Sequence, residues 1–344
     1  MEEIFEYKDC ISSVQEVESI NVYGVNKVSS LTPTFTIAIP TYKRTDTLVE
    51  TIESALSQTS SNDYHIIVVD NNPERNDETE LLMQRYIDHP KVSYYKNIEN
   101  VGMAGNWNKC LLLSPSDKVI LLHDDDVMSP FCIECFNIII SFLDDKWAMV
   151  KPNTIKFEKK EELKFNKPQL AKLYKLIPFH FFDSCPIGAP TIILLNKKSI
   201  LNLGGYNSDF YPSFDYLMSA RASLSHSLYL AWFSNPLGGY RIGKNASLSE
   251  KTMDAYYEKR YMIADSYCRE KHIPKFVSKL IHSVRNENCV KSDTAYYNMC
   301  DYVFKEELYD FWHFPSIIDN ILSLLYKNFF RIPVFLNRKK IKID

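Results

Sequence analysis

Three short apolar runs in the first part of the chain each stop abruptly at polar residues. They span residues 34–40, 64–69 and 119–122. Their nearly unbroken apolar character is typical of strands that are buried on both faces of a parallel sheet. Between them, apolar residues such as Leu48 and Ile52 recur at helical spacing. This alternation predicts an α/β fold with a mostly parallel central sheet and helices on both of its faces.

The polar residues that follow these runs add a second constraint. Residues 40–42, 70–72 and 124–126 each come directly after a predicted strand or at its end. In parallel sheets the carboxyl ends of the strands meet at one edge, and ligands bind in the crevice outside that edge. We therefore expect the three polar segments to converge on one ligand site.

The segment Asp124-Asp125-Asp126 is the most informative of the three. Adjacent carboxylates repel one another, and a divalent cation relieves that repulsion. A hard cation on a few carboxylates, with open positions for phosphate oxygens, is how proteins bind nucleotide diphosphates. A solvated acidic turn is the alternative interpretation of the triplet alone.

Composition excludes several other classes of protein. A length of 344 residues suffices for one large or two ordinary domains, and 45% hydrophobic with 24% charged residues is the globular range. The net charge of -3 argues against a nucleic-acid binder. There is no signal-peptide pattern and no apolar run long enough for a membrane span, and the cysteines fit free thiols in a reducing compartment. We therefore expect a cytoplasmic protein.

The remainder of the chain predicts further strands and then a helical end. Residues 189–195 and 228–233 are predicted strands, and Gly204-Gly205 ends a short helix that starts at Lys197. Residues 156–175 form a charged, mobile-looking segment to which we assign no strand. The predicted helices of the last part span 253–270, 275–287, 292–310 and 315–329.

Taken in chain order, the motifs resemble those of family 2 glycosyltransferases of the GT-A fold. They are residues 37–44 (IAIPTYKR), 67–72 (IVVDNN), 97–102 (NIENVG) with Asn106, 122–126 (LHDDD), 204–206 (GGY), and 214–216 (FDY) with Arg221. Such enzymes transfer a sugar from a nucleotide diphosphate, usually UDP, to an acceptor hydroxyl. They usually do so with Mn²⁺ or Mg²⁺ and with inversion at the anomeric carbon, and the resemblance implies the same cofactor here.

The resemblance covers about residues 34–250 and suggests a division of the chain. Residues 1–33 are an N-terminal extension, and residues 251–344 are a helical C-terminal region with a basic, aromatic tail. The GT-A catalytic domain between them has a nucleotide half, 34–127, and an acceptor half, 128–250.

The resemblance also implies a nucleotide-sugar site along the predicted sheet edge. Asp70 matches the carboxylate that hydrogen-bonds the uracil ring, and Gly102 lets the backbone approach the ligand closely. Arg241 or Lys244, on a polar loop, would add positive charge near the phosphates. The implied nucleotide-sugar ligands are Pro40, Thr41, Tyr42, Arg44, Asp70, Asn100, Gly102, Asn106, Asp124, Asp125, Arg241 and Lys244.

Asp126 and Asp124 are the implied metal ligands. His123 stands where the family often has an aspartate, so the working pair is either Asp124 with Asp126 or Asp125 with Asp126. Asp126 belongs to both pairs. A lone histidine carries little information, and we expect His123 to be structural.

Asp215 takes the place of the family's catalytic base. An inverting displacement needs one carboxylate, opposite the leaving group, that accepts the proton of the acceptor hydroxyl. Asp215 lies at a predicted helix start, so a helix-capping role is the alternative. Phe214 stands where the family often has an acidic residue.

The expected function is metal-dependent, inverting transfer of a hexose or N-acetylhexosamine from a UDP-sugar to a glycan hydroxyl. The family, together with the tail at 329–342, suggests a polyprenyl-diphosphate-linked acceptor in O-antigen or capsule synthesis. Basic and aromatic residues in that tail predict peripheral contact with the cytoplasmic face of the inner membrane, and a helix packed on the domain is the alternative.

Two other functions fit parts of the pattern. A sugar nucleotidyltransferase needs a glycine-rich loop after the first strand, and residues 40–44 contain no glycine. An inactive nucleotide-sugar or glycan-binding protein would not need both Asp126 and Asp215.

Overall fold

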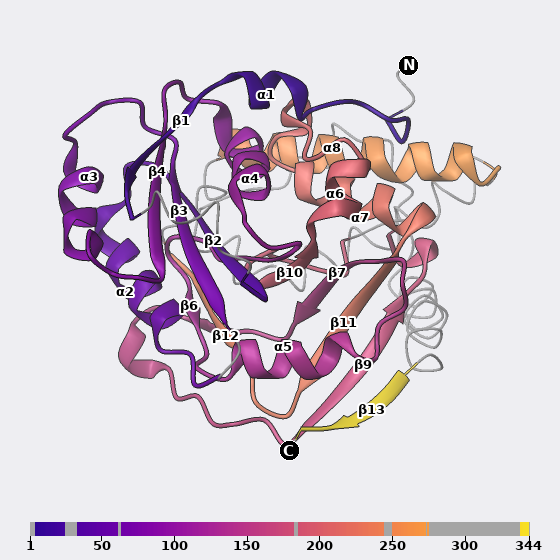
Figure 1. Ribbon diagram of the computed structural model, residues 1–344. Coiled ribbons are helices and arrows are strands. Elements are labelled where there is room, and N and C mark those ends of the chain that lie inside the picture. The colour runs from indigo at the N-terminus through magenta and orange to yellow at the C-terminus, as the bar shows by residue number, and fades with distance from the viewer. Residues whose placement is uncertain are drawn as a thin grey trace.

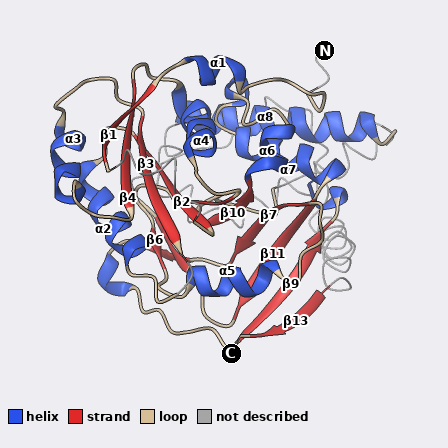
Figure 2. Cartoon of the chain, in the orientation of Figure 1, coloured by secondary structure: helices blue, strands red, loops and turns tan. Residues whose placement is uncertain are grey.

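The chain folds around a ten-stranded sheet with helices on both faces (Figures 1 and 2). The computed structural model describes residues 4–24, 33–60, 63–181, 185–243, 250–272, 274 and 338–343. In spatial order, the strands of the large sheet are β1 (Ser19–Tyr23), β4 (Val92–Asn97), β3 (Tyr64–Asp70), β2 (Phe35–Thr41), β5 (Lys118–Leu121), β10 (Ile193–Asn196), β7 (Trp147–Pro152), β11 (Ser227–Phe233), β9 (Leu170–Leu176) and β13 (Arg338–Lys342). A small sheet contains β6 (Val127–Met128), β12 (Gly238–Arg241) and β8 (Ile155–Phe157). The helices are α1 (Ser12–Glu16), α2 (Thr45–Leu56), α3 (Glu78–Met83), α4 (Gly102–Leu113), α5 (Cys132–Ile140), α6 (Lys197–Asn202), α7 (Phe214–Ser225) and α8 (Glu250–Glu270).

The direction of the strands confirms the predicted mostly parallel sheet. Strands β4, β3, β2 and β5 are neighbours and run parallel, as do β7 and β11. Only β1, β10 and β9 of the described sheet run against the rest. The carboxyl ends of β2, β3 and β5 therefore lie at the same edge, as the polar segments after them predict.

Strand β2 continues one residue beyond the stop predicted at Pro40. The carbonyl of Ala38 accepts from Leu122 N on the β5 side, and the carbonyl of Thr41 accepts from Asn71 N on the β3 side. Because strand residues alternate, Pro40 faces the β5 side, where pairing has already ended at Ala38 and Leu121. Its missing N–H therefore costs no ladder hydrogen bond, and β2 stays paired with β3 through Thr41.

Alternate residues of the central strands feed two separate cores. Ile37 and Ile39 pack on one face with apolar side chains of α2, α3 and α5. Ala38 faces the other core, which includes residues of α4, α6 and α7. Helices on both faces explain why the central strands carry almost no exposed residue, and they confirm the α/β class of the GT-A prediction.

Two segments that the sequence left unassigned contribute strands. The N-terminal extension supplies α1 and β1, and Ser19 of β1 pairs with Asn97 of β4. The prediction of a mobile segment over 156–175 is wrong for residues 156–157, which belong to β8, and for residues 170–175, which belong to β9 (Leu170–Leu176). From Leu170 to Leu173, exposed and buried residues of β9 alternate, so that only one of its faces is buried there.

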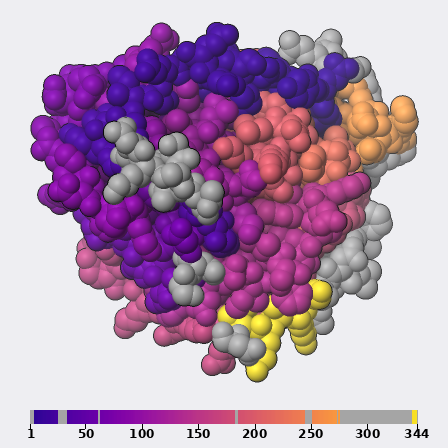
Figure 3. Space-filling model, in the orientation of Figure 1, coloured from indigo at the N-terminus to yellow at the C-terminus, as the bar shows by residue number. Residues whose placement is uncertain are grey.

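The described part of the C-terminal region begins as predicted and ends differently. Helix α8 matches the predicted helix at 253–270, whereas Arg338–Lys342 is not helical and pairs as β13 with β9. Figure 3 shows its residues at the lower edge of the molecule. The helices predicted between 275 and 329, and tail residues 329–337, lie outside the described residues. Where the chain is described, no helix combines the length and apolar character needed to cross a bilayer.

Candidate active site

The small sheet fixes the position of the acidic segment. Strand β5 ends at Leu121, and the chain turns through residues 123–126 before β6 pairs with β12. Strands β6 and β12 lie so close that a Cβ added at Gly238 would be 2.7 Å from the carbonyl oxygen of Val127. Glycine is therefore required there, because any side chain would push the acidic segment off the end of β5.

Asp124 is bonded to the loop after β2 and to α2. Its Oδ2 atom accepts a hydrogen bond of 2.8 Å from the Thr41 hydroxyl, and its carbonyl oxygen accepts one of 2.9 Å from the Thr47 hydroxyl. Burial raises the pKa of Asp124 to about 7, although Arg44 and Thr41 act in the opposite direction. The structure thus joins Thr41 and Asp124, two residues that the sequence places in the nucleotide-sugar site.

The Arg44 guanidinium lies between two of the three carboxylates. Its Nη1 atom donates to Oδ2 of Asp125 and is 3.6 Å from Oδ1 of Asp124. Arg44 is therefore a counter-ion of the acidic segment in this structure, and its contact with a nucleotide sugar stays a prediction. Tyr42, two residues earlier, is 47% exposed and open to a ligand.

Asp126 is the one member of the triplet with a buried carboxylate oxygen that has no hydrogen-bond partner. Its side chain is fully buried, and its Oδ1 atom accepts a hydrogen bond of 2.7 Å from the backbone N–H of Arg241. Its Oδ2 atom has no hydrogen-bond partner. Burial, and next the charge of Asp125, raise the pKa of Asp126 above its usual range. The Thr191 side chain, the Arg241 N–H and the charge of Lys151 act on this pKa in the opposite direction. A buried anionic oxygen without a partner is costly unless a cation binds it.

The surroundings of Asp126 fit a divalent cation. Ligand atoms of His123, Asp125 and Asp126 lie within 4.8 Å of one another, the one such group found in the described residues. Burial lowers the pKa of His123 to about 4, so the imidazole is neutral and keeps a lone pair. Asp124 is not in this group; its predicted role as a metal ligand, and the choice between the two aspartate pairs, stay open.

Two threonines support the acidic segment, and the sequence analysis missed them. The Thr51 hydroxyl donates to the carbonyl of Asp126 over 2.8 Å, as the Thr47 hydroxyl does to the carbonyl of Asp124. The signal was present, because threonines four residues apart lie on the same side of a helix. Helix α2 thus holds both ends of the triplet by its backbone.

Arg241 is bonded to the protein at three points in this structure, and its contact with the phosphates stays a prediction. Its Nε atom donates to the Asp125 carbonyl over 2.7 Å, and Nη1 donates to the Glu158 carbonyl over 3.0 Å. Its Nη2 atom pairs with Glu50, and the guanidinium lies 4.5 Å from the centre of the Phe157 ring. The side chain therefore clamps the acidic segment between α2 and β8. Lys244, the alternative cation, lies outside the described residues.

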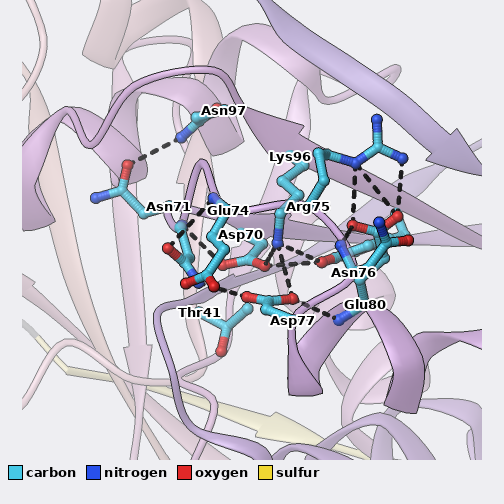
Figure 4. Close-up of polar contacts among 12 residues, drawn as sticks. Thr41, Asp70, Asn71, Glu74, Arg75, Asn76, Asp77, Glu80, Lys96 and Asn97 are labelled. Carbon is cyan, nitrogen blue, oxygen red and sulfur yellow. Dashed lines mark hydrogen bonds and ion pairs between the residues drawn. The ribbon is translucent and has the colours of Figure 1, made fainter.

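Asp70 lies in a closed polar network at the end of β3. Its Oδ2 atom accepts from Lys96 Nζ and from the Tyr94 hydroxyl, each over 2.7 Å, and Oδ1 accepts from Asn72 N over 2.9 Å. Lys96 also reaches Asp77, over 3.0 Å (Figure 4). Burial raises the pKa of Asp70, and the Lys96 hydrogen bond opposes that shift. The Asp70 side chain is fully buried and accepts three hydrogen bonds from the protein, and its contact with the base stays a prediction.

A cluster of asparagine side chains shapes the wall beside Asp70. Asn71 donates to Asn100 over 2.8 Å, and Asn97 donates to Asn106 over 3.0 Å. Gly102 has a φ of +73°, which favours glycine, and its N–H donates to Asn100. The structure therefore brings the predicted residues Asn100, Gly102 and Asn106 together, through bonds made by Asn71 and Asn97.

Asp215 is the second residue of α7, and Ser213 is its N-cap. Backbone N–H groups of residues 215 and 216 act on the Asp215 carboxylate, so a role at the helix start stays an alternative to the predicted role as base. Burial raises the pKa of Asp215 to about 6, against the effect of backbone N–H donors. Trp107 packs on both His123 and Phe214, with ring centroids 5.2 and 4.8 Å apart. One aromatic side chain thus separates the acidic segment from the neighbour of Asp215.

An open cleft of about 460 Å³ adjoins the acidic segment. It is lined by Asp46, Thr47, Glu50, Glu158, Arg241, Ile242 and Gly243. Thr47 and Arg241, which bond the backbone of the triplet, form part of its wall. The cleft therefore opens beside the acidic segment, between α2 and β12.

Comparison with known proteins agrees with this geometry. Residues 36–204 match the family described as Glycosyl transferase family 2. An uncharacterized glycosyltransferase of Rickettsia felis is 31% identical over 137 residues, which are 40% of this chain and 22% of that protein. An uncharacterized protein of Mycobacterium tuberculosis is 24% identical over 208 residues, 56% of this chain and 62% of that protein. The chain thus spans less than two thirds of the length of either relative.

Solved structures show the same fold. S. aureus TarS 1-349 in complex with UDP-GlcNAc has a TM-score of 0.54 at 13% identity, over 88% of this chain and 81% of that one. The complex of the same protein with UDP also has a TM-score of 0.54, at 14% identity, over 80% of this chain and 77% of that one. The predicted GT-A fold and glycosyltransferase class are confirmed at the level of fold and family. Residues 36–204 of the chain, just under half of its length, thus resemble a domain of glycosyl transferase family 2.

Proposed function

We propose that the protein transfers a hexose or N-acetylhexosamine from a UDP-sugar to a hydroxyl group of a glycan, with the help of a divalent cation. The observation that carries this proposal is the buried, unpartnered Oδ2 atom of Asp126, held at the carboxyl ends of parallel strands. The family supports sugar transfer, and TarS, of the same fold, binds UDP and UDP-GlcNAc.

Asp125 and Asp126 are the carboxylates that would hold the cation. A divalent cation held by these residues, Mn²⁺ or Mg²⁺, would supply positive charge to neutralise the leaving diphosphate. The residues around them keep this pair in place: Thr51 holds the backbone of Asp126, and Arg241 bonds both the carbonyl of Asp125 and, through its own N–H, the carboxylate of Asp126. The pair is thereby positioned before any ligand arrives.

Asp215 is the proposed general base. The acceptor oxygen forms a bond to the anomeric carbon while the bond from that carbon to the phosphate oxygen breaks, and its electron pair leaves with UDP. The hydroxyl proton passes to the Asp215 carboxylate. Attack from the side opposite the diphosphate inverts the anomeric centre. A pKa near 6 leaves the carboxylate mostly ionised at neutral pH yet more basic than an exposed aspartate.

We also propose that the acceptor is linked to polyprenyl diphosphate and belongs to a surface polysaccharide such as an O-antigen or capsule. The support is the basic and aromatic sequence at 329–342, which suits contact with the cytoplasmic face of the inner membrane. In its described part, Lys339, Lys340 and Lys342 of β13 are exposed. Liposome flotation of the full chain and of a form ending at residue 328 tests this part; equal flotation would count against it.

The central test combines donor binding with transfer. A panel of nucleotide sugars with and without Mn²⁺ should raise the melting temperature only for the true donor; at 100 times its Kd a ligand adds about 2.7 kcal/mol. Asp215→Asn should keep this shift and lose transfer by about 10²-fold or more. Asp209→Asn is the matched control, because Asp209 lies six residues earlier in chain order and its side chain makes an exposed ion pair with Lys8. Unchanged transfer in Asp215→Asn would show that another group is the base, and binding without transfer in the unsubstituted protein would indicate an inactive binding protein.

A further inference from the structure

His123 directly precedes the acidic segment, and one of its ring nitrogens faces Asp126. Its Nδ1 atom is 3.7 Å from Oδ2 of Asp126. That separation is too long for a hydrogen bond. It suits two ligands of one ion, because atoms that each lie about 2.1 Å from a cation are roughly 3 to 4 Å apart. The other ring nitrogen, Nε2, is buried and has no hydrogen-bond partner.

The imidazole ring is held in this orientation by buried aromatic residues. It lies on Trp107 with ring centroids 5.2 Å apart and an interplanar angle of 35°. Trp107 is in turn held edge-on by Tyr206 and Phe214, at 5.2 and 4.8 Å. The ring therefore does not need to be ordered when an ion arrives, which lowers the cost of binding.

Asp126 provides the independent evidence that a ligand belongs at this point. Its side chain is fully buried, and its Oδ2 atom faces His123 without any hydrogen-bond partner. The Oδ1 atom is fixed by Arg241 N, so the carboxylate cannot rotate freely to satisfy the second oxygen. Asp125 completes a group whose ligand atoms all lie within 4.8 Å.

We propose that His123 is a nitrogen ligand of the catalytic cation, and that it makes the site prefer Mn²⁺ or Co²⁺ over Mg²⁺. Mg²⁺ favours an octahedron of oxygen ligands, whereas imidazole nitrogen suits transition-metal ions. A site with one nitrogen and two carboxylates therefore discriminates between ions of equal charge. This inference rests on the cation of the proposed function, but it concerns the ligand set and is tested without sugar transfer.

The first experiment measures the unsubstituted protein. Metal-free protein receives one equivalent of Mn²⁺, with and without UDP, and is studied by pulsed electron paramagnetic resonance. The expected result is an echo modulation from a directly bound ¹⁴N nucleus. Bound Mn²⁺ without nitrogen modulation would overturn the role of His123 while leaving the cation site intact. No bound Mn²⁺ under either condition would overturn the cation site of the proposed function as well.

Variants identify the nitrogen. His123→Ala should lose the modulation and bind Mn²⁺ at least about tenfold more weakly. His123→Asp restores an all-oxygen site, so that the ratio of Mn²⁺ to Mg²⁺ affinity should fall by about tenfold while Mg²⁺ binding is kept. His272→Asn is the matched control, because His272 is exposed and its φ of +54° is one that asparagine tolerates. Modulation that persists in His123→Ala would overturn the assignment, and the spectrum of the unsubstituted protein decides even where that variant does not fold.

Discussion

Two strand ends at the same edge of the sheet carry buried carboxylates in opposite states. At the end of β3, Asp70 has both oxygens bonded, and its counter-charge is Lys96 of the neighbouring strand. Beyond β5, Asp126 keeps one oxygen without a partner, and no lysine or arginine side chain is paired with it among the described residues. The same sequence pattern, an apolar strand that ends in aspartate, thus produces a structural network in one place and a ligand-ready group in the other. The difference lies in whether the protein supplies the cation.

Removing the internal cation should produce the largest effect. Lys96→Met leaves Asp70 buried and charged without its partner, so the free energy of unfolding should fall by about 3 to 5 kcal/mol. Denaturant unfolding measures the change. Lys91→Met is the control, since Lys91 only lies over the ring of Tyr64 and should cost less than about 1 kcal/mol. The double variant Asp70→Asn/Lys96→Met should recover part of the loss; a loss equal to that of Lys96→Met would show that charge pairing is not the cause.

The opposite behaviour is expected at Asp126. Asp126→Asn removes a charge that Lys151 influences without a direct ion pair, so the melting temperature of the metal-free protein should stay the same or rise. Sugar transfer should fall on the order of 10²-fold, because the cation loses a ligand. Asp70→Asn should show the opposite pattern, in which the loss of stability is the main effect. A strong drop in the stability of Asp126→Asn would remove the contrast between the two strand ends.

A substitution at Arg241 tests whether the Asp126 carboxylate depends on the contacts that Arg241 makes. Arg241→Lys keeps a positive charge but loses the planar fork that reaches Glu158, Glu50 and the carbonyl of Asp125. We expect the Mn²⁺ concentration for half-maximal activity to rise about tenfold, with the KM for UDP-sugar unchanged at saturating Mn²⁺. Arg75→Lys, in the half-exposed pair with Glu80, should change neither value. A raised KM for UDP-sugar alone would instead support the predicted contact of Arg241 with the phosphates.

The smallest effect is the pH dependence of the rate, which tests Asp215 as the base. Burial raises the pKa of Asp215 to about 6, and only the ionised carboxylate accepts a proton. The rate should therefore rise with pH through this value, reach half of its plateau near pH 6, and fall below it as the carboxylate is protonated. The profile of kcat/KM measures this at saturating cation. A profile that is flat from pH 5 to 7 would contradict the assignment.

The central strands and the position of the acidic segment could be predicted because both depend on local sequence. Strand β9 could not, since its burial alternates regularly only from Leu170 to Leu173 and the consecutive residues Tyr174 and Lys175 both lie outside the core. The pairing of Asp70 with a lysine also could not be predicted from the sequence. Its lysine is 26 residues away, and only the register of β3 with β4 brings them together.

Contacts over longer distances decided the rest of the site. Arg241 meets Asp125 and Asp126 across more than 110 residues, through the pairing of β6 with β12. The orientation of the His123 ring depends on Trp107, which lies in α4. Residue type suggested each group's chemistry, but whether a group is already bonded depends on packing that a single sequence does not display.

The two edges of the large sheet, in the described chain, come from segments far outside the family match. Strand β1, at residues 19–23, covers β4, and β13, at 338–342, covers β9. A fragment cut to residues 36–204 or 34–250 would leave the backbone groups of these inner strands open to other chains. Such a fragment is expected to self-associate, so the unit suited to expression is larger than the unit that sequence comparison delimits.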